Sequence, residues 1–82
     1  MANHDSGTVE RALRVLEEAN HAGAKAQTRS VALALWVLRP HCPAEWLRNF
    51  WDAAGSENDI GRSQGLNASF NGIVRRVKVP GR

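Results

Sequence analysis

The segment Val31–Leu38, Val-Ala-Leu-Ala-Leu-Trp-Val-Leu, is the longest uninterrupted apolar run in the chain. A run that is apolar on every side predicts an element buried on every side, and the pattern fits either a central helix or a short buried strand. The frequent alanines, and Thr28 or Ser30 as a cap, favour the helix. Because a residue that precedes a proline is disfavoured in helical conformation, Pro40 ends the element. We therefore expect a buried second element over residues 25–38.

A chain of 82 residues has room for one domain with one modest core. The single cysteine, Cys42, excludes an internal disulfide, so that packing must hold the fold, as suits a reducing cytoplasm. The start, Met1–Asp5, lacks the pattern of a signal peptide, and the apolar run is far shorter than the roughly 20 residues that span a bilayer. We expect a cytoplasmic protein without a membrane partner. Its expected parts are a flexible lead-in over 1–7, a helical domain over 8–78 and a loose end over 79–82.

Helical spacing of apolar residues predicts three more helices, over 8–21, 43–54 and 59–78, the last capped by Asn58 or Asp59. The predicted fold class is therefore all-α, a compact single domain of about four short helices. The order of elements in the C-terminal half also fits a helix-turn-helix-like pair. The side chains expected to be largely buried are Leu13, Leu16, Leu35, Leu47, Phe50, Phe70, Ile73 and Val77.

The large aromatic side chains are concentrated in the middle of the chain, where Trp36, Trp46 and Trp51 occur close to Phe50. One interpretation is that all four simply form the core. The other is that Trp46 or Trp51 is partly exposed and anchors a protein contact, because aromatic anchors dominate interface energies. This second interpretation predicts a protein-interaction module or a small homo-oligomer that uses the Trp-rich third helix.

The net charge of +3 is unevenly distributed. Residues 1–59 contain six Lys/Arg and eight Asp/Glu, whereas residues 60–82 contain five Lys/Arg and no acid. A basic C-terminal part is compatible with an anionic partner, and it is equally typical of a solvated basic tail.

The last predicted helix presents a polar face opposite its apolar stripe. Gln and Asn can bond adenine, Arg can bond guanine, and Lys can neutralise phosphate. The small residues Ala68 and Gly72 are expected on the same outer face. The pattern predicts a small nucleic-acid-binding or regulatory protein that uses its last helix. The candidate binding residues are Gln64, Asn71, Arg75, Arg76 and Lys78.

Patterns that indicate catalysis or metal binding are missing from the sequence. The residues His4, His21, His41 and Cys42 do not have the spacing of a structural zinc site. Cys42 precedes a predicted helix N-terminus, where a thiol pKa can be lowered, which makes it a candidate for mild reactivity. No glycine pattern matches a phosphate-binding loop. We expect no enzyme, no catalytic residue, no metal or cofactor and no small-molecule substrate.

Overall fold

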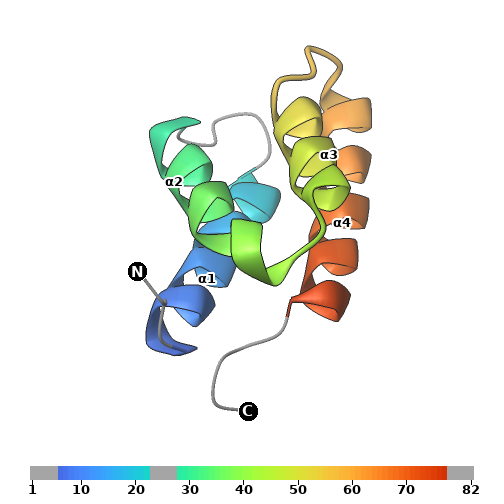
Figure 1. Ribbon diagram of the computed structural model, residues 1–82. Coiled ribbons are helices and arrows are strands. Elements are labelled where there is room, and N and C mark those ends of the chain that lie inside the picture. Colours follow the sequence, from blue (N-terminus) through green and yellow to red (C-terminus); the bar gives the residue numbers. More distant parts are fainter. Residues whose placement is uncertain (1–5, 23–27, 78–82) are drawn as a thin grey trace.

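The computed structural model describes residues 6–22 and 28–77, and the chain forms two helical hairpins (Figure 1). In the first hairpin α1 spans Ser6–Ala22 and α2 spans Thr28–Leu38. No strand occurs within these described ranges, so the prediction of an all-α fold is confirmed, and Val31–Leu38 is helical. None of the helices in the described part of the chain is long and apolar enough to cross a membrane.

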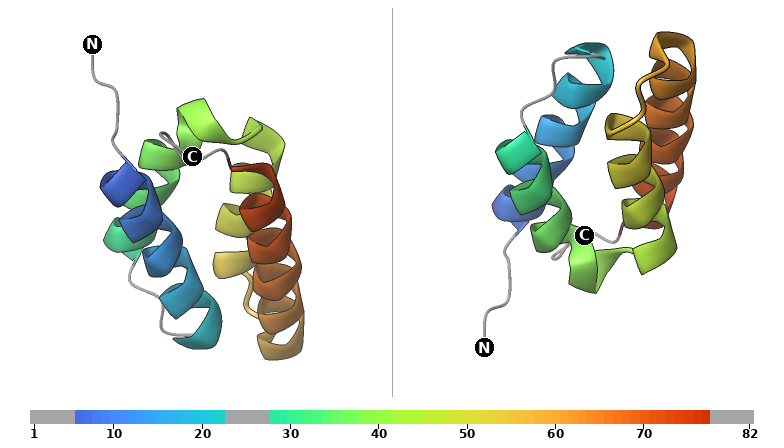
Figure 2. Two further views of the ribbon diagram at one scale, coloured as in Figure 1. Left: turned by 90° about the horizontal axis from the view of Figure 1, so that it is seen from below. Right: turned by 90° about the horizontal axis from the view of Figure 1, so that it is seen from above.

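The second hairpin follows a short 3-10 turn, η2, over Arg39–His41. It consists of α3, Ala44–Ala54, and α4, Asp59–Arg76, which run side by side in opposite directions (Figures 1 and 2). A helix-turn-helix pair crosses at about 90–120°, whereas α3 and α4 lie alongside each other as a helical hairpin. All four helices lie close to their predicted positions. Residues 25–27 and Lys78, predicted at helix ends, lie outside the described residues.

The core lies between the two hairpins and receives side chains from all four helices. Phe50 on α3 is completely enclosed, as are Leu66 and Ile73 on α4. Five of the side chains predicted to be buried are so: Leu16, Leu35, Leu47, Phe50 and Ile73. Three others are half-buried at the edge of the core: Leu13, Phe70 and Val77.

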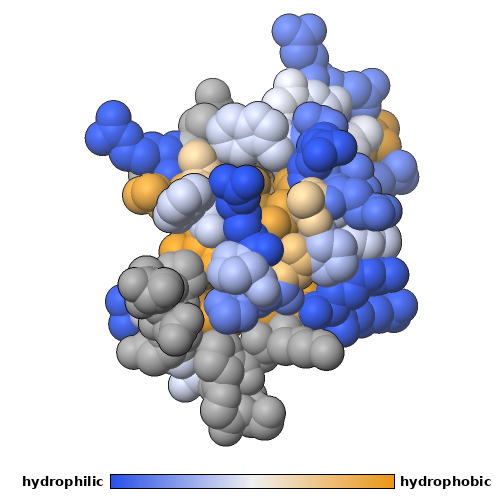
Figure 3. All heavy atoms as spheres, in the orientation of Figure 1, coloured by the Kyte–Doolittle hydropathy of each residue, from blue (hydrophilic) through white to orange (hydrophobic). Residues whose placement is uncertain are grey.

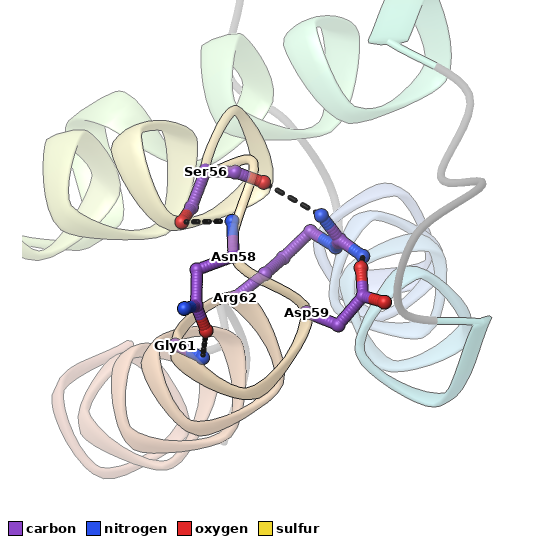
Figure 4. Close-up of polar contacts among 5 residues, drawn as sticks. All are labelled: Ser56, Asn58, Asp59, Gly61 and Arg62. Carbon is purple, nitrogen blue, oxygen red and sulfur yellow. Dashed lines mark hydrogen bonds and ion pairs between the residues drawn. The ribbon is translucent and has the colours of Figure 1, made fainter.

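The turn between α3 and α4 is held by side chains at the start of α4 (Figure 4). The side-chain oxygen of Asn58 accepts a hydrogen bond of 2.7 Å from the backbone N–H of Gly61, which confirms Asn58 as the cap. Arg62 is buried, donating through Nη1 to the Ser56 carbonyl at 2.6 Å and through Nη2 to the Asp59 carboxylate. One of the basic residues of 60–82 is therefore a structural residue of this turn.

The side of α4 that packs on α3 carries small residues. A Cβ atom at Gly65 would lie 2.9 Å from the Cβ of Ala53, and a Cβ atom at Gly72 would overlap the indole ring of Trp46. Gly72 is buried, so the prediction that it lies on the outer face of the last helix is wrong. The reason is that α4 packs against both α1 and α3, and its covered surface is wider than the apolar stripe alone.

The apolar helix α2 is buried on one side only. Its inward side carries four buried residues: Val31, Ala34, Leu35 and Leu38. Its outward side carries Leu33, which is 60% exposed, and Trp36, which is 59% exposed. The prediction of a central helix buried on every side is therefore wrong. The physical reason is that the described chain forms only two hairpins, and no described element packs over this outer side.

Candidate functional site

An apolar groove of about 510 Å³ opens between α2 and α3. Leu35 and Leu47 are buried and form its floor, while Trp36 from α2 and Trp51 from α3 stand exposed beside it. Trp51 is 41% exposed. Viewed from the same direction as Figure 1, hydrophobic surface is open between the two hairpins, with strongly hydrophilic side chains next to it (Figure 3).

The two helices contribute to the groove through the same residue spacing. On one side Ala32, Leu35 and Trp36 of α2 follow one another at i, i+3 and i+4, and Arg39, the first residue of η2, extends the series to i+7. On the other side Ala44, Leu47, Arg48 and Trp51 follow the same spacing. Residues at these intervals share one face of a helix, so each side of the groove is a continuous helical face. The turn η2 joins the two faces at one end (Figure 1).

The charge of the groove is positive. Arg39 holds its guanidinium 5.3 Å from the centroid of the Trp36 ring, a cation–π arrangement. Arg48 is exposed on the opposite side. Neither arginine forms an ion pair with any residue that the structure describes, and no acidic residue lines this groove. The groove therefore combines apolar surface and two tryptophans with two arginines that form no ion pair with a described residue.

Trp46 lies on a different side of α3. It is half-buried and packs on Gly72 of α4, and Arg76 places its guanidinium 4.1 Å from the centroid of the Trp46 ring. Arg76 also donates a hydrogen bond of 3.1 Å to the Gly72 carbonyl. Of the two predicted interaction residues, the groove thus includes Trp51 but not Trp46.

Trp36 was missed as a site residue, because an apolar run gives no signal of which side stays exposed. A weak signal was available, since Arg39 extends the face of Ala32 and Trp36 at helical spacing. An arginine at the end of such a face indicates that the face reaches the surface.

The outer face of α4 carries the predicted nucleic-acid contacts. Gln64, Asn71 and Arg75 are exposed there, as expected from the helical spacing. Arg76 is also exposed, but its guanidinium lies over Trp46. Lys78, the remaining candidate, lies outside the described residues. The face between Gln64 and Arg75 is lined by neutral side chains, so its positive charge is concentrated at the C-terminal end of α4.

Cys42 is buried beside η2, and burial raises the pKa of its thiol, while the charge of Arg76 lowers it to a lesser degree. The expectation of a lowered thiol pKa is therefore wrong, because desolvation of the buried thiol outweighs the lowering by the charge of Arg76. Within the described ranges no group of three or more metal-binding side chains comes together.

A second, smaller groove of about 300 Å³ lies between α1 and α2. The exposed Leu33 contributes to it, with Val15 and Val37 beside it. The outward side of α2 therefore borders two apolar grooves, of which the one next to α3 is larger and contains both exposed tryptophans.

Comparisons of this chain with protein-family models, curated proteins and solved structures found no match.

Proposed function

We propose that this domain is a protein-interaction module that docks a partner in the groove between α2 and α3. The observation that carries the proposal is the exposure of Trp36 and Trp51 beside one groove, with Arg39 and Arg48 next to them. Tryptophan and arginine are among the residue types enriched at the positions that dominate binding energy in protein interfaces.

The exposed apolar surface supports the same proposal. Large apolar patches on a small protein are often sites of interaction, whereas single scattered apolar residues are ordinary. Here Leu33 and Trp36 lie one helical turn apart on α2, and Trp51 lines the same groove as Trp36. A partner that covered these side chains would remove apolar area from water, which favours association.

The proposal is tested by selecting binders from a library of displayed random peptides. Binding of the selected peptides should be lost in Trp36→Ser and in Trp51→Ser. The matched control is Ile60→Ser, which removes a side chain that is 71% exposed on α4 and lines neither groove. All three positions are exposed, so these variants should keep the helical circular dichroism spectrum. Selected peptides that bind all of the variants equally well would refute the proposed docking site.

Nucleic-acid binding through α4 is the second candidate function. Its support is the exposure of Gln64, Asn71 and Arg75 along one side of that helix. A phosphate backbone requires several cations for tight binding. Arg62 is held by the Ser56 carbonyl and Asp59, and Arg76 donates a hydrogen bond to the Gly72 carbonyl. The test is a gel-shift titration with duplex DNA at low salt. Arg75→Ala should weaken a shift. The absence of any shift at protein concentrations above the roughly 10⁻⁴–10⁻⁶ M expected for non-specific binding would exclude this function.

The proposal also includes a role without catalysis and a location in the cytoplasm. Both rest on the sequence, which contains no catalytic pattern and a single cysteine.

A further inference from the structure

We infer that the partner bound in the groove between α2 and α3 is an amphipathic helix with acidic residues beside its apolar face. This inference rests on the proposed docking function and adds the chemical class of the partner.

The shape of the groove favours a helix as the occupant. Two helical faces border it, and each presents side chains at i, i+3, i+4 and i+7. A helix laid in such a groove offers its own apolar residues at the same intervals, which is a common mode of peptide recognition. Trp36 and Trp51 lie on opposite sides of the buried floor, so that both can contact the apolar face of one inserted helix.

The positive charge of the groove favours acidic residues beside the apolar face of the bound helix. Arg39 and Arg48 line the groove without an acidic partner among the described residues, and they come from opposite sides of it. Carboxylates that flank the apolar face of a bound helix would meet both guanidinium groups. Arg39 is already held over the ring of Trp36, so less side-chain freedom is lost when it pairs.

The same charges disfavour a second copy of this chain as the occupant. A two-fold dimer buries the same surface patch on both subunits. Both copies would then bring Arg39 and Arg48 into one shared interface, and like charges brought together oppose association. An acidic helix would instead bring opposite charges to Arg39 and Arg48.

The experiment uses the displayed-peptide library with the whole 82-residue chain. We analyse the peptides whose binding depends on Trp36. These peptides should be rich in Asp and Glu, with apolar residues at helical spacing. In the strongest one, replacing every acid with Lys should weaken binding about tenfold at low salt, and the loss should shrink as salt rises. Arg48→Glu should remove the preference for the acidic form, whereas Arg75→Glu, on a helix that does not line the groove, should leave it unchanged.

The possible outcomes separate this inference from the proposed function. Trp36-dependent peptides that are neutral or basic, or that bind equally well after the acids are replaced, would overturn the acidic helix and keep the docking site. A dimer in sedimentation analysis that Trp36→Ser dissociates would assign the groove to a second copy and also overturn the inference. If no selected peptide depends on Trp36 or Trp51, the docking site itself is wrong.

Discussion

The indole ring of Trp46 lies directly against the backbone of Gly72, in a position that a β-carbon on residue 72 would occupy. The guanidinium of Arg76 covers the same ring and donates a hydrogen bond to the Gly72 carbonyl. The contact joins α3 to α4, and only glycine at position 72 allows it. This glycine is therefore explained by packing between two helices rather than by flexibility.

Gly72→Ala should destabilise the domain. An added methyl group in a packed contact costs about 1–3 kcal/mol, which exceeds the gain of up to about 1 kcal/mol in helix propensity. In a Trp46→Ala background the overlap is gone, so that Gly72→Ala should become neutral or stabilising. Urea denaturation of the four proteins measures both effects. If Gly72→Ala changed the free energy of unfolding by the same amount in the wild-type and Trp46→Ala backgrounds, the packing contact would be contradicted.

Phe50→Ala and Phe70→Ala should differ in their cost. Phe50 is completely buried, and its replacement should lower the free energy of unfolding by about 3–5 kcal/mol, enough to unfold a domain with a thin stability margin. Phe70 is half-buried at the edge of the core, so its loss should cost less. Thermal denaturation followed by circular dichroism compares the two. A Phe70→Ala variant that unfolds while Phe50→Ala stays folded would contradict the arrangement of the core.

Asn58→Ala should lower the free energy of unfolding by about 1 kcal/mol, because it removes the side chain that caps α4. The control is Asn71→Ala, which changes the same residue type at an exposed position inside α4. Alanine favours a helix interior, so the control should be neutral or slightly stabilising. The cap would be refuted by equal midpoints of urea denaturation for the two variants.

The thiol of Cys42 should make stability depend on pH in the alkaline range. Burial raises its pKa in the folded state, so the folded chain holds the thiol proton more tightly than the unfolded chain. This contribution is fully present below the ordinary thiol pKa and is lost as pH rises through about 9 and beyond. Cys42→Ala should therefore show a flatter decline above this pH. An identical alkaline decline in both proteins would show that another group is responsible.

The helices were predictable because their signals are local. The apolar spacing in α1, α3 and α4, Asn58 as a cap and Pro40 after α2 depend on residues within a turn or two of each other. The exposure of α2 was not predictable, because Val31–Leu38 is apolar on all sides and only the number of neighbouring elements decides which side is covered.

The candidate site was predictable in part. Trp51 was identified from the wide apolar stripe of the third helix, while Trp46 has the same residue type and similar spacing but packs on Gly72. Which of the two faces solvent depends on where α4 packs, and that contact joins residues far apart in the sequence. The exposure of Trp36 was not predictable either, because its neighbours in the sequence are all apolar and the packing of the helices decides which side of α2 is covered.

The most direct test of the docking site is a nuclear magnetic resonance titration with the strongest selected peptide. The three tryptophans each give an indole N–H signal, and the protein thus contains its own control. The signals of Trp36 and Trp51 should shift as the peptide is added, because both rings stand beside the groove. The signal of Trp46 should keep its chemical shift, because that ring lies under Arg76 and outside the groove. Shifts confined to Trp46, or to the backbone amides of the outer face of α4, would contradict a docking site between α2 and α3.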